Sequence, residues 1–117
     1  MIYSEKNHTF VVCAYKESPY LSECIDSLLN QTKKGEILIS TSTPNSYIQE
    51  IAEKYHLPVY VNTGKKSIAD DWNYGCSKVK TELFTIAHQD DFYEKEYLET
   101  VLEKLNQSEN PLIAFTD

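Results

Sequence analysis

Two adjacent carboxylates stand where a short apolar run of the sequence ends. The run is Leu83 to Ala87, and His88-Gln89-Asp90-Asp91 follows it directly. Mg²⁺ and Mn²⁺ bind few protein oxygens and complete their shells with water and substrate phosphate. Asp90 is therefore a candidate ligand for a divalent cation that neutralises a diphosphate. In the alternative, Asp91 caps the next helix with Glu94 and Asp90 is solvated; both roles can hold together.

Polar or small residues follow the other apolar runs as well. Ala14-Tyr15 offers a small residue beside which a flat ligand can approach the backbone. The hydroxyl groups of residues 40–43 can hydrogen-bond a base or a sugar. Lys65 and Lys66 precede a helical pattern, where they can attract a phosphate, although the glycine spacing of a P-loop is absent. For each segment the alternative is an ordinary polar loop.

The spacing of apolar residues predicts alternating strands and helices. Strands are expected at 10–14, 36–39, 58–61, 83–87 and 112–115. Helices are expected between them, at 20–30, 48–55, 67–79 and 97–105, because apolar residues recur there at helical spacing. Ser18 with Pro19 is expected to open the first helix, and Ser67 with Asp70 the third. This order predicts a single α/β domain over 1–117.

Such an α/β order implies an open, mostly parallel sheet with helices on both faces. Ligands bind these sheets beyond the carboxyl ends of the strands. The polar segments described above all follow predicted strands, so we expect them to gather at that one edge.

Composition excludes several classes of function. The 117 residues carry a net charge of −7, and all eleven basic residues are lysine, so a broad nucleic-acid grip and a guanidinium clamp on phosphate are disfavoured. The three cysteines form no CxxC pair, which argues against a zinc site or a disulfide scaffold. Their positions favour core packing. Reduced thiols and the missing signal-peptide pattern predict a cytoplasmic location, with membrane association through other segments left open.

Taken together, these segments resemble the N-terminal half of a family-2 glycosyltransferase with the nucleotide-diphospho-sugar transferase (GT-A) fold. The resemblance runs from about residue 9 to residue 117. Its most telling stretches are Tyr15 with Tyr20-Leu21, Ser27-Leu28-Leu29-Asn30-Gln31-Thr32, Asp71-Trp72-Asn73-Tyr74-Gly75 and Gln89-Asp90-Asp91. Each stretch is weak alone, but their order and spacing together are fairly specific.

The resemblance implies a nucleotide-sugar donor site and assigns residues to it. The implied donor-binding residues are Ala14, Tyr15, Thr41, Ser42, Asn73, Gln89, Asp90 and Asp91. Asp90 matches the second acid of the family's Asp-x-Asp motif and would hold Mg²⁺ or Mn²⁺.

The chain departs from the family's pattern at several of the matched positions, and of the loop after the first strand only Tyr15 is kept. His88 replaces the first acid of the Asp-x-Asp motif, and Trp72 replaces a common arginine. Thr41, followed by Ser42, takes the place of an acid that usually holds the base.

The implied activity is transfer of a sugar from the nucleotide to an unknown glycan, lipid or other hydroxyl acceptor, with inversion. The catalytic base is expected beyond Asp117, so this chain is expected to be an incomplete transferase. The alternative is a non-catalytic nucleotide-binding or interaction module on the same fold.

Overall fold

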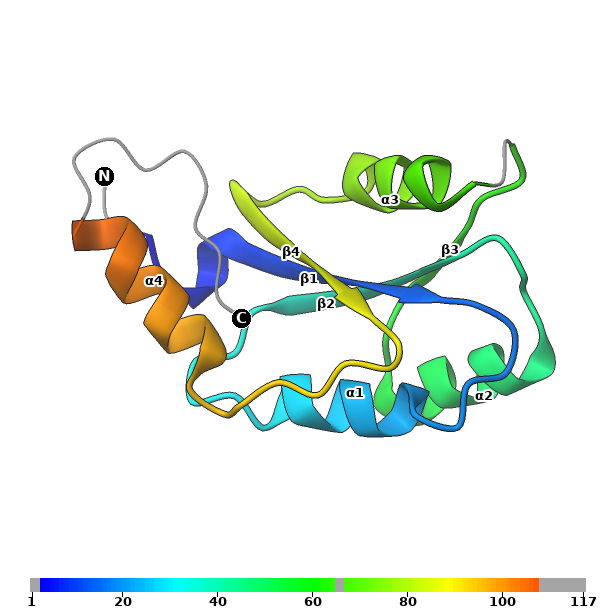
Figure 1. The fold of residues 1–117 in the computed structure, drawn as a ribbon, viewed down its shortest axis with the longest axis horizontal. Helices are drawn as coiled ribbons and strands as arrows, with labels where there is room; N and C mark the ends of the chain where they lie inside the picture. Colours follow the sequence, from blue (N-terminus) through cyan, green and yellow to red (C-terminus); the bar gives the residue numbers. More distant parts are fainter. Residues whose placement is uncertain (1–2, 65–66, 108–117) are drawn as a thin grey trace.

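The computed structural model describes residues 3–64 and 67–107 (Figure 1). Its elements, in chain order, are η1 (Glu5–Asn7), β1 (His8–Ala14), α1 (Leu21–Leu29), β2 (Glu36–Thr41), α2 (Ser46–Tyr55), β3 (Val59–Val61), α3 (Ile68–Ser77), β4 (Leu83–His88) and α4 (Tyr97–Gln107). The alternation of strand and helix is the one that the apolar spacing predicts, and the ends differ by one or two residues. The expected strand at 112–115 lies outside the described residues.

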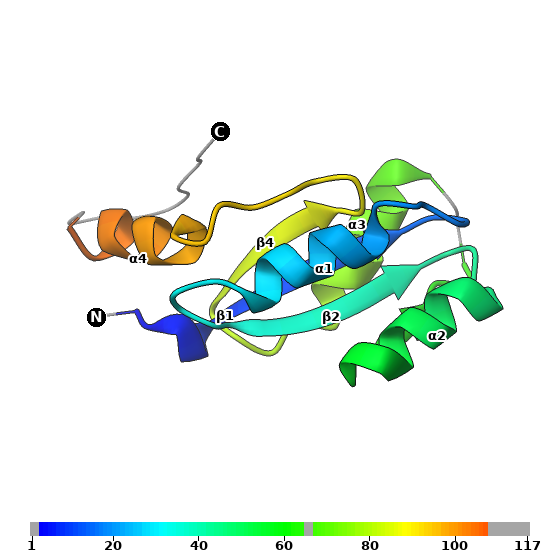
Figure 2. The same ribbon diagram turned by 90° about the horizontal axis from the view of Figure 1, so that it is seen from below.

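The described strands form one parallel four-stranded sheet in the order β3-β2-β1-β4. Helices α1 and α2 cover one face and α3 covers the other (Figures 1 and 2). The predicted open α/β fold with helices on both faces is therefore confirmed. The chain first winds from β1 to β2 and β3, and then crosses to β4 on the other side of β1. Ligands of open α/β sheets bind at such a reversal, beyond the carboxyl ends of the strands.

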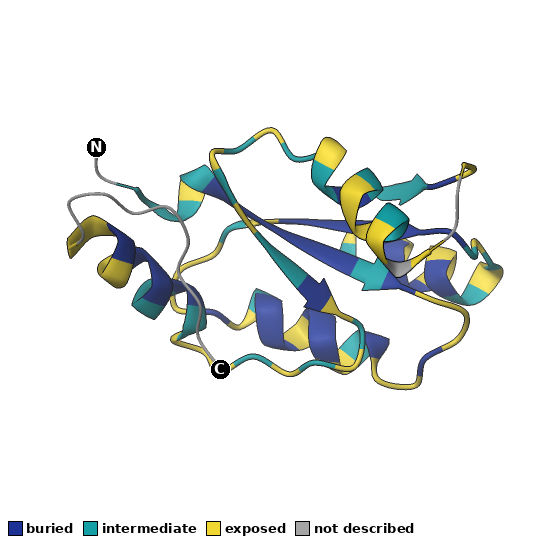
Figure 3. Cartoon of the chain, turned by 45° about the horizontal axis from the view of Figure 1, so that its top comes forward, coloured by how far each residue is buried: buried dark blue, intermediate teal, exposed yellow. Residues whose placement is uncertain are grey.

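The hydrophobic core lies between the sheet and the helices α1, α2 and α4. Strand β1 is central, and both β1 and the inner side of α1 are buried (Figure 3). The side chains that meet there are fully or almost fully buried: Phe10, Val12, Leu21, Ile25, Leu28, Ile39, Ile48, Ala87 and Leu98. On the helices these residues occupy the predicted apolar stripes, because a helix buries positions that recur every three to four residues.

Helix α3 lies very close to the opposite face of the sheet because of Gly75. A Cβ atom at this position would lie 2.7 Å from Val11 Cγ1 and 3.2 Å from Ser40 Cβ. Only a glycine permits this approach without a shift of the neighbouring side chains. The close packing fixes the height of α3 above β1 and β2, and with it the residues on its first turns.

Two of the expected helix caps are wrong. Helix α1 begins at Leu21 with Tyr20 as the N-cap, so Ser18 lies before the helix. Asp91 does not cap α4, which begins at Tyr97. The expected cap at Ser67 is confirmed, because its side chain accepts a hydrogen bond from the backbone N–H of Asp70.

Candidate functional site

The loops that follow β1 and β4 are joined by the side chain of Gln89. Its Oε1 accepts from the backbone N–H of Tyr15 at 2.8 Å, and its Nε2 donates to the backbone oxygen of Tyr15 at 3.0 Å. Both ends of the amide are therefore used, which fixes its orientation. Gln89 thus links the two loops at the point where the strand order reverses, and it holds the backbone of Tyr15, whose side chain is exposed.

Asp90 makes the second link between the same two loops. The hydroxyl group of Ser18 donates to Asp90 Oδ1 at 2.8 Å and accepts from the backbone N–H of Tyr20 at 3.2 Å. Ser18 is buried, whereas Asp90 is exposed. The buried serine therefore orients one carboxylate oxygen of Asp90, while the Asp90 side chain stays accessible to solvent.

Asp91 serves the turn after β4. Its Oδ2 accepts from the backbone N–H of His88 at 3.2 Å and from the hydroxyl group of Tyr93 at 3.4 Å. Burial, with the negative charge of Asp91 nearby, raises the pKa of Tyr93, so this hydroxyl stays protonated and remains a donor. Asp91 therefore stabilises the turn of the backbone after β4 that contains Asp90.

A second polar cluster joins the ends of β2 and β3 to α3. Asp71 Oδ2 accepts from the Ser42 hydroxyl at 3.2 Å, and Asp71 Oδ1 accepts from Asn62 Nδ2 at 3.1 Å. Ser42 and Asn62 are buried, and Thr41 beside them is buried as well. The carboxylate is therefore oriented from both sides by neutral donors, at the same edge of the sheet as Asp90.

The loops after β1 and β2 are also tied together. Lys16 has a left-handed backbone, with φ of 54°. Its N–H donates to Thr43 Oγ1 at 2.6 Å, and Asn45 Nδ2 donates to its backbone oxygen at 3.0 Å. These bonds offset the strain of the left-handed conformation. The Lys16 ammonium lies 5.1 Å from the centre of the Tyr15 ring, which places a cation at the exposed edge.

Two of the departures from the family's pattern contact each other in space. The rings of Trp72 on α3 and His88 at the end of β4 have centroids 5.4 Å apart and are tilted by 51°. His88 is exposed, and Trp72 keeps 37% of its surface accessible. Asn73, the next residue of α3, is exposed too.

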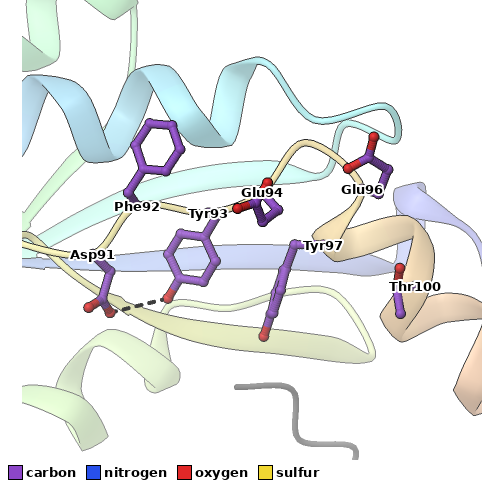
Figure 4. A pocket seen from close by; sticks show the side chains of 7 residues that line it. All are labelled: Asp91, Phe92, Tyr93, Glu94, Glu96, Tyr97 and Thr100. Carbon is purple, nitrogen blue, oxygen red and sulfur yellow. Dashed lines mark hydrogen bonds between the residues drawn. The ribbon is translucent and has the colours of Figure 1, made fainter.

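A pocket of about 510 Å³ begins at Asp91 and continues along the segment that leads to α4 (Figure 4). Its lining combines aromatic rings with carboxylates: Asp91, Phe92, Tyr93, Glu94, Glu96, Tyr97 and Thr100. The rings of Tyr93 and Tyr97 meet edge to face at 4.9 Å. Of these residues only Asp91 is predicted from the sequence to belong to a site, because Tyr97 and Thr100 fall in the predicted helix and the others in the segment before it.

The sequence-predicted site residues gather at the carboxyl edge, but in two groups. Tyr15, Gln89, Asp90 and Asp91 surround the strand reversal. Thr41 is the last residue of β2 and Ser42 follows it, in the second group, which surrounds Asp71. The side chain of Ala14 is buried, so it belongs to the core. Lys65 and Lys66 lie outside the described residues.

The sequence did not reveal the roles of three residues that position this edge, Ser18, Asn62 and Asp71.

The cysteines are not disposed for nucleophilic chemistry. Burial raises the pKa of Cys13 to about 11 and that of Cys24 to about 12. A thiol of such pKa is protonated near neutral pH, and the thiolate is the reactive form. The positions of these cysteines, on β1 and on the buried side of α1, agree with the predicted packing role.

This geometry defines an open α/β domain with a polar, carboxylate-bearing edge at a strand reversal, and comparisons with known proteins place it in a family. The profile of glycosyl transferase family 2 matches residues 9–115. Glycosyltransferase GlyA of Streptococcus pneumoniae serotype 4 is 28% identical over an alignment of 102 residues, and the match covers 83% of this chain and 15% of GlyA. The crystal structure of S. aureus TarS 1-349 matches with a TM-score of 0.69 and 21% identity, over 85% of this chain and 33% of TarS.

The chain belongs to glycosyl transferase family 2. The resemblance stated from the sequence motifs is thereby confirmed, and the likeness to TarS confirms the GT-A-type fold. The chain spans 15% of the length of the curated relative that it matches. No helix among the residues that the structure describes is long and apolar enough to cross a membrane.

Proposed function

We propose that this chain is the donor-binding part of a glycosyltransferase and that it binds a nucleotide-diphospho-sugar across the carboxyl edge of its sheet. The observation that carries the proposal is the placement of Asp90. This exposed carboxylate stands at the end of β4, beside the strand reversal, and is held there by the buried Ser18. Family membership supports glycosyl transfer as the class of reaction, and the polar side chains gathered at one edge of the sheet support a donor site there.

The residues at this edge fit a divalent cation that has a single protein ligand. Gln89 is engaged with Tyr15, and His88 lies against Trp72. Within 3–64 and 67–107 no three acidic, histidine or cysteine side chains are grouped as a metal cage. Mg²⁺ commonly binds through one or two carboxylates and completes its shell with substrate phosphates and water. Asp90 would therefore hold Mg²⁺ or Mn²⁺ jointly with the diphosphate, where the ion would neutralise charge on the leaving group.

The other parts of the site have separate tasks. Tyr15 offers an exposed ring beside which a base can lie, and Ser42 with Asp71 offers oriented polar groups. The acceptor is a hydroxyl compound whose class these residues do not define. Transfer with inversion requires one carboxylate or other base to take the proton of that hydroxyl, and we assign no residue of this chain to that step.

The test is calorimetric titration of UDP, GDP and ADP into the chain, with and without Mn²⁺. We expect one nucleotide to bind more tightly when Mn²⁺ is present. Asp90→Asn keeps the shape of the side chain but removes its charge, and should cost about tenfold or more of that affinity, or about 1.4 kcal/mol or more.

The matched control is Glu50→Gln, an equal change of charge at an exposed position of α2. It should leave nucleotide affinity unchanged. Equal effects of the two substitutions would show that Asp90 contributes only general charge, and unchanged affinity in Asp90→Asn would remove it from the site.

The second candidate function is a nucleotide-binding or interaction module without transferase activity. The observation that favours it is the use of Gln89 as a backbone brace and the replacement of the first motif acid by His88. Nucleotide binding that is equally tight with and without Mn²⁺, and unaffected by Asp90→Asn, would select this candidate.

A further inference from the structure

The exposed Trp72–His88 pair lies at the same edge as the proposed donor site. His88 ends β4, and its Cα is paired across the sheet with that of Cys13, directly before the loop that carries Tyr15. Trp72 reaches the pair from α3, whose close approach to the sheet is set by Gly75. The pair therefore stands beside the strand reversal, with Asp90 two residues further along the chain.

The exposure of the pair points to a ligand of a particular shape. A tryptophan that served packing alone would be expected to be largely covered, yet Trp72 keeps 37% of its surface accessible and its neighbour His88 is exposed. Aromatic rings present broad apolar faces, and the best partner for such a face at a polar edge is a group with an apolar side and polar rims. The ring of a hexopyranose has this character.

The charges around the pair restrict the chemical class of sugar that it would bind. The carboxylates of Asp90 and Asp91 lie two and three residues after His88, and neither Trp72 nor His88 supplies the fixed charge of a guanidinium. Carboxylates accept hydrogen bonds from sugar hydroxyl groups and repel a second carboxylate. A neutral, hydroxyl-rich sugar is thus favoured over an acidic one.

The geometry points to Trp72 and His88 as the residues that bind the glycosyl group of the donor, by stacking against one face of a neutral hexose. This assignment rests on the proposed function, because it places the sugar next to a nucleotide diphosphate held at Asp90. Trp72 and His88 act on the sugar, whereas Asp90 acts on the diphosphate. Substitutions at the two places should therefore affect different ligands.

The test compares each nucleoside diphosphate with its sugar-bearing form, using UDP with UDP-glucose and GDP with GDP-mannose, all with Mn²⁺. In the native chain we expect the sugar to tighten binding by about three- to tenfold, the range expected for aromatic stacking. Trp72→Ala and His88→Ala should each reduce that gain strongly and leave the affinity for the plain diphosphate unchanged. Trp72→Phe, which keeps a ring, should retain part of the gain.

Two further readouts keep the test independent of protein stability. Trp72 is the only tryptophan of the chain, so its fluorescence should change on addition of UDP-glucose more than on addition of UDP. Phe92→Ala removes another exposed ring, 73% accessible, and should preserve the gain from the sugar. UDP-glucuronate should bind more weakly than UDP-glucose.

The possible failures are distinguishable. A sugar-dependent gain that persists in Trp72→Ala, or a parallel loss of affinity for both forms of the ligand, would overturn the assignment of the sugar to this pair while leaving the donor site in place. A chain that binds none of the nucleoside diphosphates would overturn the proposed function itself, and the sugar assignment with it.

Discussion

The two ends of the same parallel sheet are built from different kinds of contact. At the amino end, His8 and Thr9 are buried, and they meet Thr85 and Thr81 through neutral contacts of 2.7 Å. At the carboxyl end, loops are joined by exposed or half-buried polar side chains, among them Gln89 and Asp90. At the amino end the polar side chains of β1 are buried, whereas at the carboxyl end the carboxylate of Asp90 is exposed to water.

This difference separates the part of the chain that stabilises the fold from the part that is available for binding. Buried apolar area supplies most of the stability of a small domain. Bonds between exposed loops contribute much less, and they fix geometry more than they add stability. Substitutions at the two ends should therefore divide into those that change unfolding and those that change ligand binding.

The largest effect is expected in the core next to the amino end. Phe10 is fully buried and its ring contacts those of His8, Tyr93 and Tyr97. Phe10→Ala should lower the free energy of unfolding by about 3–5 kcal/mol, through lost burial and a residual cavity. Urea denaturation followed by circular dichroism measures it. The control is Phe84→Ala, which removes a half-exposed ring from β4 and should cost about 1 kcal/mol or less. Equal losses would contradict the assignment of the core.

The next effect is a loss of stability in acid that arises at His8. Burial lowers the pKa of this ring from 6.5 to about 4. The folded chain therefore resists a proton that the unfolded chain binds. The contribution of the neutral His8 ring to the free energy of unfolding is fully present above about pH 6.5. It is lost as the pH falls towards 4, by up to about 3 kcal/mol at about 1.4 kcal/mol per pKa unit.

Urea unfolding at several pH values between these limits measures this loss. Replacement by an apolar residue, His8→Leu, should flatten the dependence over this range. His56→Asn, at an exposed left-handed position that asparagine tolerates, should leave it unchanged. A dependence that survives in His8→Leu would assign it to other groups.

A pair of glycines compares the two ends directly. A Cβ at Gly35 would lie 2.8 Å from the backbone oxygen of His8, and one at Gly75 would lie 2.7 Å from Val11 Cγ1. Gly35→Ala and Gly75→Ala should each cost about 1–3 kcal/mol of stability through overpacking. Only Gly75→Ala should also weaken nucleotide binding, because it displaces the helix that carries Asp71. Calorimetric titration under conditions where both variants are folded separates the effect on nucleotide affinity from the effect on stability. Equal losses of affinity in the two variants would contradict the functional difference between the two ends of the sheet.

The sequence is sufficient to predict the fold and the edge of the sheet where polar residues gather. Apolar spacing is a local signal, so it located α1 and β4 to within about one or two residues, the usual uncertainty of element ends. It failed at Ser18 and Asp91, where a capping pattern is present but the helix begins further along the chain. Ser18 bonds Asp90 from 72 residues away, and local sequence cannot reveal such a partner.

The cross-links of the carboxyl edge escaped prediction for the same reason. Gln89 and Tyr15 are 74 residues apart, and Ser42 and Asp71 are 29 apart. Asp71 falls within the helix predicted at 67–79, and only the position of α3 against β2 and β3 turns its carboxylate towards Ser42. The contact of Trp72 with His88 was equally hidden. A tertiary contact between two positions that depart from the family's pattern becomes visible only in the folded chain.

The most direct test of the central claim is a map of amide chemical shifts in the ¹⁵N-labelled chain as the tightest-binding nucleoside diphosphate is added with Mg²⁺, which is diamagnetic. We predict that the largest changes fall on Tyr15, Ser42, Gln89 and Asp90, at the carboxyl edge. Thr9 and Gly35, at the amino end, should remain unchanged. Changes centred on the amino end, or spread evenly over the chain, would contradict the assignment of the carboxyl edge as the donor site.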